Sequence, residues 1–148
     1  MMRQSLKGFA VSVALLLFAA VPVYGSDVPL PDKIEIMQPA ADVPENVRQF
    51  LGRWEGKWGT ELNHIFIVTS VSASGAAEAI YAYGNAPKWN VTPDWHRVQG
   101  TISGNKLELP RFPNSAEVSY TLRGDGTLAG KYWHKSYLTP GTLVLVSK

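Results

Sequence analysis

The stretch FLGRWEGKW, Phe50 to Trp58, alternates two kinds of residue. Uncharged residues occupy every second position and charged residues occupy the positions between: Gly52, Trp54, Gly56 and Trp58 against Arg53, Glu55 and Lys57. Successive side chains of a strand point to opposite faces, so this pattern sends the charges to water and the glycines and tryptophans inward. Glycine lets neighbouring strands approach, and tryptophan fills a narrow interior. The stretch therefore predicts the first strand of a small closed β-barrel.

Strand-like segments follow one another to the end of the chain. We expect strands at Phe50–Trp58, Leu62–Val71, Ala76–Gly84, Trp95–Ile102, Lys106–Leu109, Ala116–Leu122, Thr127–Lys135 and Thr142–Ser147. Several alternate cleanly, as in Val118, Tyr120 and Leu122, which indicates one buried and one wet face. Turn residues such as Ser74-Gly75 and Gly104-Asn105 separate them.

No helical pattern long enough for a crossover separates these segments, so sequential antiparallel pairing is expected. About eight such strands close most economically into an up-and-down barrel, which removes exposed edges. The predicted class is all-β, a small antiparallel barrel with a short N-terminal helix. A two-sheet sandwich is the alternative.

A short helix is predicted just before the first strand. Asp42 and Glu45 form a capping-box variant around Pro44, which favours a helix over Pro44–Phe50. A short helix followed by Gly52-Arg53-Trp54 resembles the calycin superfamily of lipocalins, fatty-acid-binding proteins and avidins. The resemblance implies a barrel and small-molecule binding. The same opening is similar to that of exported bacterial β-barrel proteins, a likeness that implies no activity.

The chain departs from lipocalins at two places. The connection Gly59-Thr60-Glu61 is short where lipocalins have a long loop at the open end, and no Arg follows the last strand. A G-x-W-like opening is also similar to that of nitrobindins, a family of haem-binding barrels. Their haem-ligand motif is not matched here.

The N-terminal residues are typical of a secretory signal peptide. Arg3 and Lys7 precede an uncharged apolar run, Phe9–Ala20, that is shorter than the roughly 20 residues a bilayer needs. We expect cleavage before Ser26, and an uncleaved membrane anchor is the alternative. The predicted organisation is a signal peptide at 1–25, an extended Pro-rich lead-in at 26–41 that lies over the barrel wall, and the barrel domain at 42–148. The predicted location is the periplasm or the outside of the cell.

Charge and cysteine content exclude several classes. Arg3 and Lys7 are two of the 14 basic residues, so 12 basic and 12 acidic residues remain after cleavage. This balance argues against an electrostatic binder of nucleic acid or of anionic membranes. Cysteine is absent, which excludes disulfides, a lipid-modified N-terminal Cys and a thiol nucleophile.

Loop lengths predict a floor and a mouth. With the helix at the floor, the connections there are tight, whereas Asn85–Asp94, Pro110–Ser115 and Ser136–Gly141 at the other end are long and rich in Pro and aromatic residues. Loops on a rigid barrel are where function concentrates, so this end is the candidate mouth.

Aromatic residues and all three histidines fall near that end. By strand parity Trp58, Tyr83, His96, Tyr132 and His134 face inward, and Trp89 and Trp95 lie near the rim. His64 starts a strand that is apolar on both faces, so its side is open. The candidate ligand-binding residues are Trp58, Tyr83, His96, Tyr132, His134 and His64.

The sequence thus predicts a non-catalytic barrel that holds a small apolar or aromatic molecule at its open end. The rings would supply stacking surface and the histidines polar anchors. No cofactor, no nucleic acid and no stable membrane insertion are expected. A histidine-dependent haem- or metal-binding protein or enzyme is one alternative. An interaction module that uses the aromatic loop Asn85–Asp94 is another.

Overall fold

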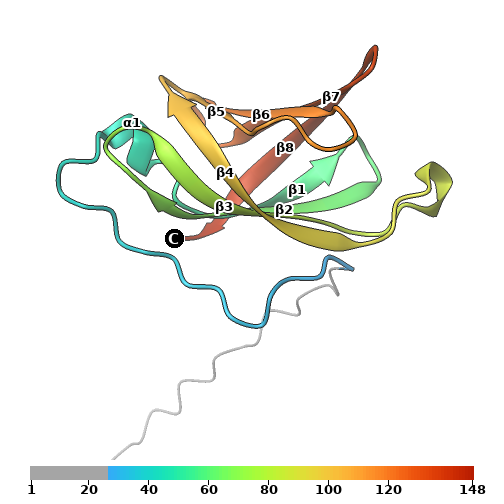
Figure 1. The fold of residues 1–148 in the computed structure, drawn as a ribbon, viewed down its shortest axis with the longest axis horizontal. Coiled ribbons are helices and arrows are strands. Elements are labelled where there is room, and N and C mark those ends of the chain that lie inside the picture. The colour runs from blue at the N-terminus through green and yellow to red at the C-terminus, as the bar shows by residue number, and fades with distance from the viewer. Residues whose placement is uncertain (1–26) are drawn as a thin grey trace, which may run out of the picture.

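The computed structural model describes residues 27–148 as a closed barrel of eight antiparallel strands preceded by one short α-helix (Figure 1). The predicted signal peptide lies outside these residues. The elements are α1 (Glu45–Arg48), β1 (Gly52–Trp58), β2 (Leu62–Val71), β3 (Ala76–Tyr83), the 3-10 turn η1 (Pro87–Trp89), β4 (Asp94–Ser103), β5 (Lys106–Glu108), β6 (Glu117–Leu122), β7 (Leu128–His134) and β8 (Tyr137–Ser147).

Each strand pairs with the next in sequence, and β8 returns to pair with β1. Trp58 of β1 lies opposite Leu62 of β2 on one side and Gly141 of β8 on the other. The predicted all-β up-and-down barrel is confirmed, and the sandwich alternative is wrong because an antiparallel ladder, with one register shift at Arg53/Trp54, joins β1 to β8 and closes the sheet.

The glycines of β1 bring its backbone against β8. A Cβ on Gly56 would lie 2.0 Å from the carbonyl oxygen of Thr142, and one on Gly52 would lie 2.6 Å from that of Ser147. Trp54 fills the interior between them with 1% of its surface exposed, and its indole N–H donates to the Phe50 carbonyl at 2.9 Å. The glycines of FLGRWEGKW therefore let β1 pair closely with β8, and Trp54 fills the interior.

Large side chains pack the floor half of the barrel interior. The least exposed of them come from six of the eight strands: Trp54, Phe66, Val68, Leu107, Tyr120, Leu128 and Leu143. Burying an aliphatic or aromatic side chain stabilises the fold by about 1.5–3 kcal/mol. Side chains therefore fill this part of the barrel interior.

Helix α1 is shorter than predicted and is held differently. Pro44 is its N-cap, and no side chain caps the helix, so the predicted capping box of Asp42 and Glu45 is wrong. Arg48 instead donates to the carbonyl oxygens of Val43 at 2.7 Å and Ala40 at 2.8 Å. These bonds fold the preceding chain back onto the single helical turn.

Residues 27–41, the N-terminal strap, cross the outside of β2, β3 and β4 without regular secondary structure (Figure 1). A second hydrophobic cluster lies outside the barrel, where the strap packs against the wall. The strap contributes Val28, Leu30, Ile34 and Ile36, and the wall contributes Ile65, Ile67, Ile80, Ala82 and Trp95. At the mouth end Asp27 accepts hydrogen bonds from the Asn63 side chain at 2.9 Å and the Asn85 backbone N–H at 2.6 Å. The strap explains why β2 is apolar on both faces.

The last hairpin differs from the prediction. Ser136–Gly141 was expected to form a long mouth loop, but β8 begins at Tyr137 and pairs with β7 from His134↔Tyr137 onward. Only Lys135 and Ser136 make the turn, with Lys135 at φ 54°. The remaining long connections at the mouth are 84–93, which contains η1, and 109–116. Within residues 27–148, no helix is both long enough and apolar enough to cross a bilayer.

Candidate functional site

Aromatic and imidazole rings at the mouth end form one continuous series of contacts, the ring series. It runs through His96, Tyr83, Tyr81, His64, Trp58, Tyr132 and His134, with successive ring centroids 6.0, 5.9, 4.6, 5.0, 5.9 and 6.5 Å apart. All six predicted site residues belong to this series, and Tyr81 joins its two halves. The structure thus brings the candidates together; whether they bind a ligand stays a prediction.

Two glycines opposite each other hold Trp58 in place. Gly130 of β7 pairs with Gly141 of β8, and the indole lies against both. A Cβ on Gly130 would be 2.8 Å from two atoms of the indole, and one on Gly141 would be 2.9 Å from a third. The absence of side chains here lets the large ring cross from β1 over β8 to β7.

His64 faces inward and is 1% exposed. Its Nδ1 donates to the Ala82 carbonyl oxygen at 2.7 Å, and its Nε2 accepts from the Tyr120 hydroxyl at 2.7 Å. A carbonyl can only accept, so the neutral imidazole carries its proton on Nδ1. Burial lowers the pKa of His64 to about 4, which keeps the ring neutral. Both ring nitrogens are hydrogen-bonded within the protein. Because the ring is also buried, His64 belongs to the layer of side chains that closes the bottom of the mouth, which we call the floor of the mouth.

Two buried tyrosines complete this floor. Tyr120 stacks on Phe66 with ring centroids 4.2 Å apart, and Tyr81 meets Phe112 edge to face at 5.1 Å. Burial raises the pKa of both phenols, so they are neutral hydrogen-bonding groups at physiological pH. Their inward parity was visible in the alternation of their strands, although neither was among the predicted site residues.

The Trp58 indole N–H is buried and, among residues 27–148, has no hydrogen-bond partner. It lies close enough to the Tyr81 hydroxyl to oppose the rise of that group's pKa, but the two do not meet in hydrogen-bonding geometry. An unsatisfied buried donor costs about 1–3 kcal/mol. The floor of the mouth therefore contains a donor that an acceptor could satisfy.

One side of the lip is formed by Tyr83, His96 and Asp94. The Tyr83 hydroxyl lies 3.3 Å from Nε2 of His96, and Asp94 Oδ2 lies 3.6 Å from the same nitrogen. Partial burial, followed by the nearby Asp94 and Tyr132, raises the pKa of Tyr83. β5 pairs with β4 only over Thr101–Ser103, so the part of β4 that carries His96 borders the opening.

The other side of the lip is formed by Tyr132 and His134 of β7, both partly buried. The Tyr132 hydroxyl accepts from the Asn114 side chain at 3.0 Å, and Asn114 Oδ1 accepts from the Ala116 backbone N–H at 2.9 Å. Asn114 thereby fixes the 109–116 connection against the lip. No sequence pattern singled out Asn114, because its role arises from a contact between distant segments.

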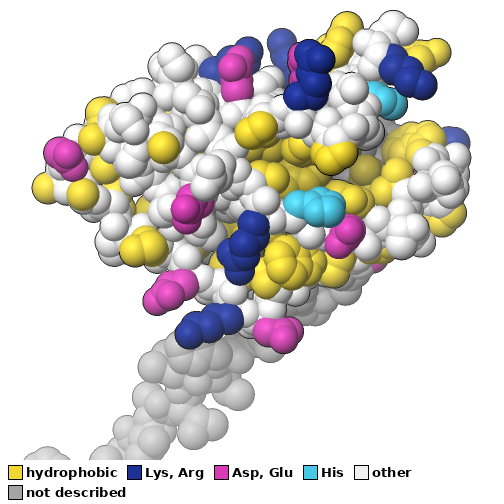
Figure 2. All heavy atoms as spheres, viewed as in Figure 1, with side chains coloured by type: hydrophobic (Ala, Val, Ile, Leu, Met, Phe, Trp, Pro, Cys, Tyr) yellow, Lys and Arg dark blue, Asp and Glu magenta, His cyan; other side chains and the backbone are white. Residues whose placement is uncertain are grey.

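Figure 2 shows a recess lined by apolar side chains in the half of the molecule that carries the η1 loop, with histidine side chains at its margin. The predicted rim is only partly observed. Trp89 is exposed in η1, whereas Trp95, at the mouth end of β4, points outward and packs against the apolar cluster under the strap. Trp95 and His96 are consecutive in a strand and necessarily face opposite sides.

The histidines do not assemble a metal site. Within residues 27–148, no group of three or more His, Asp or Glu side chains could hold a metal ion. His64 lies in the floor with both nitrogens occupied, whereas His96 and His134 lie on opposite sides of the lip. One form of the histidine-dependent alternative, a metal ion held by all three histidines, is therefore wrong for this part of the chain.

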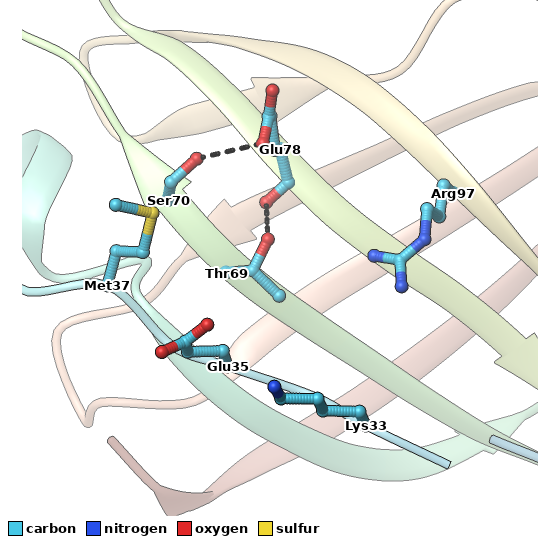
Figure 3. Close-up of a pocket in the computed structure, with 7 residues that line it drawn as sticks. All are labelled: Lys33, Glu35, Met37, Thr69, Ser70, Glu78 and Arg97. Atoms are coloured by element: carbon cyan, nitrogen blue, oxygen red, sulfur yellow. Dashed lines mark hydrogen bonds between the residues drawn. The ribbon is translucent and has the colours of Figure 1, made fainter. Parts of the chain in front are cut away.

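A pocket of about 380 Å³ lies outside the barrel, between the strap and the wall (Figure 3). Strap residues Lys33, Glu35 and Met37 face wall residues Thr69, Ser70, Glu78 and Arg97 across it. A bulge in β2 between Val68 and Ser70 frees the Thr69 carbonyl, which accepts from the Met37 backbone N–H at 2.8 Å. The sequence predictions contained no site on this face.

The fold and the ring series define a small closed antiparallel barrel with an aromatic mouth, an architecture compatible with the calycin-like fold. No protein-family model matches the chain, and it matches neither a curated protein nor a solved structure.

Proposed function

We propose that this protein is an exported, non-catalytic barrel that holds a small apolar or aromatic molecule at its mouth. The observation that carries the proposal is the ring series, which lines the mouth with Tyr83 and Tyr132 above a floor of Trp58 and His64. The export part of the proposal is supported by the signal-peptide pattern of residues 1–25.

The packing limits how the molecule would bind. The floor half of the barrel is filled, so the ligand lies above Trp58 and between the partly buried rings of Tyr83 and Tyr132. Aromatic pairs contribute about 0.5–1.5 kcal/mol beyond the area they bury, so two such contacts favour a flat or ring-bearing ligand. An acceptor on the ligand would find donors in the neutral Tyr83 hydroxyl and, deeper, in the Trp58 indole.

A neutral aromatic probe, N-phenyl-1-naphthylamine, tests the proposal. Its fluorescence should rise on binding the purified protein, and displacement by members of a fatty-acid and aromatic library would identify the ligand class. In the double variant Tyr83→Leu/Tyr132→Leu we expect affinity to fall about tenfold, or about 1.4 kcal/mol. Trp133→Leu is the matched control, because Trp133 is next to Tyr132 in β7 but exposed on the outer face.

The proposal fails if the probe does not bind, or if the control variant loses as much affinity as the lip variant. A Soret band in the protein as isolated, lost in His96→Ala/His134→Ala, would replace it with haem binding.

A further inference from the structure

The outer surface of the β7–β8 hairpin is apolar and cationic. In residues 127–148 the chain contains Lys131, Lys135 and Lys148 but no Asp or Glu. Exposed apolar side chains lie along the same segment: Trp133 is 44%, Leu138 47%, Val144 53% and Val146 53% exposed. Large apolar side chains gathered on one exposed strand pair mark an interaction surface.

The strand register places these residues on one face. Lys131 is paired with Pro140 between the inward-facing pairs Gly130↔Gly141 and Tyr132↔Thr139, and Trp133 is paired with Leu138 between Tyr132↔Thr139 and His134↔Tyr137. Leu143 points inward and is fully buried, so its neighbour Val144 points outward. We call these outward residues, together with the exposed Lys135 of the turn and the exposed Val146 at the register shift of β8, the hairpin face: Lys131, Trp133, Lys135, Leu138, Val144 and Val146.

The strands on either side do not neutralise this charge. On β1, Glu55 is held by Arg53 at 2.6 Å, and at the start of β6 Glu117 is ion-paired with Arg111. Among the described residues, Lys131 and Lys135 have no ion-pair partner, and neither has Lys57, which lies beside the face on β1. The equal numbers of basic and acidic residues outside the predicted signal peptide thus conceal a locally cationic surface.

We propose that the hairpin face docks on an anionic lipid bilayer. Tryptophan is enriched where protein meets the headgroup region, and aliphatic side chains beside it can enter the acyl boundary. Lysines near an anionic surface each contribute about 1 kcal/mol to binding. A second copy of the chain is disfavoured as the occupant, because two such faces would bring lysines together with no carboxylate between them.

This surface is separate from the proposed ligand site. Trp133 and Tyr132 are consecutive in β7 and face opposite sides, so a variant of one leaves the other in place. Loss of lipid binding and loss of probe binding can therefore be measured independently, and either proposal can fail alone.

Flotation of the purified protein with lipid vesicles tests the docking. We expect binding to vesicles of phosphatidylglycerol and phosphatidylcholine, weak binding to phosphatidylcholine alone, and release as salt is raised. Lys131→Gln/Lys135→Gln should weaken binding about 25-fold, about fivefold for each lysine. Trp133→Ser/Leu138→Ser should also weaken it, at unchanged salt dependence.

The matched controls remove similar groups from the opposite wall. Lys33→Gln/Arg97→Gln deletes two cations beside the strap, and Met37→Ser deletes an apolar side chain that is 62% exposed there. Both should bind vesicles as the unmodified protein does, and thermal melts should show that every variant is folded. The proposal is overturned if anionic vesicles are not bound at low salt, or if control and hairpin variants lose binding equally. A dimer that disappears in Trp133→Ser/Leu138→Ser would also overturn it, because the face would then belong to a second copy.

Discussion

The indole of Trp58 stacks on the imidazole of His64, with ring centroids 5.0 Å apart and planes inclined by 25°. The two residues belong to neighbouring strands, and the stack separates the packed floor half of the barrel from the half-exposed rings of the lip. The Trp58 indole lies against Gly130 and Gly141, and the ring nitrogens of His64 are hydrogen-bonded to Ala82 and Tyr120. The depth of the mouth therefore depends on this one stacked pair.

Replacing Gly130 with alanine should displace the indole. The new Cβ would lie 2.8 Å from two Trp58 ring atoms, and the buried ring has little space to move away. Overpacking of this kind costs about 1–3 kcal/mol, so we expect the urea midpoint to fall and the near-UV circular dichroism of tryptophan to change. Gly124→Ala is the control, because nothing lies within 4 Å of a Cβ at that position.

The destabilisation caused by Gly130→Ala should depend on Trp58. In a Trp58→Phe background the smaller ring leaves room for the methyl group, so Gly130→Ala should destabilise the fold less than it does with Trp58 present. A double-mutant cycle measures this coupling. Equal costs in the two backgrounds would show that the glycine is not required by the indole.

Acidification from neutral pH should destabilise the barrel through His64. Its pKa is about 4 in the folded protein and near the ordinary value of 6.5 in the unfolded chain. Between these values the unfolded chain binds more protons, so stability is complete above pH 6.5 and falls as the pH decreases toward 4. Over this whole pH range the free energy of unfolding should fall by about 3 kcal/mol.

Urea unfolding at pH 7 and at pH 5 measures this effect before most carboxylates titrate. His64→Phe should be less stable at pH 7, because the Tyr120 hydroxyl and the Ala82 carbonyl lose their partner, but its stability should change little between the two pH values. The explanation fails if His64→Phe keeps the pH dependence of the unmodified protein.

The strand pattern of the chain predicted the fold well, because period-two alternation and turn residues act locally. FLGRWEGKW alone placed Trp54 and Trp58 inside, and parity placed Tyr83, His96, Tyr132 and His134 on the inner face. Features that depend on distant segments were not visible. The side of His64 was undetermined because Ile65 and Ile67 are buried outside the barrel by the strap.

The start of β8 was missed for a related reason. Tyr137–Gly141 contains Pro140 and Gly141, which are typical of a loop. In the barrel, the Pro140 carbonyl instead accepts from the Gly59 backbone N–H at 2.8 Å, and Gly141 provides the space that Trp58 occupies. A residue whose role is to make room for a ring on another strand cannot be recognised from its own neighbours in sequence.

Removing the Asp27 carboxylate should release the mouth end of the strap. The Asp27 carboxylate accepts hydrogen bonds from the Asn63 side chain and from the Asn85 backbone N–H. Both bonds lower the pKa of Asp27, and the bond from Asn63 has the larger effect. In Asp27→Ala we expect faster amide hydrogen exchange at Asn85 and along the strap, with little change in the barrel strands. Asp32→Ala, an exposed strap carboxylate, is the control; exchange that rises equally in both variants would contradict the assignment.

Replacing Gly56 with alanine should open the seam between β1 and β8. The new Cβ would overlap the Thr142 carbonyl oxygen at 2.0 Å, and backbone on both strands would have to move apart. That shift breaks the ladder at Gly56↔Leu143 and also lifts Trp58 from Gly141, so the loss should exceed that of Gly130→Ala and reach about 3 kcal/mol or more. Hydrogen exchange should then accelerate first in β1 and β8. If Gly56→Ala folds with unchanged protection of those two strands, the close approach of their backbones is not what closes the barrel.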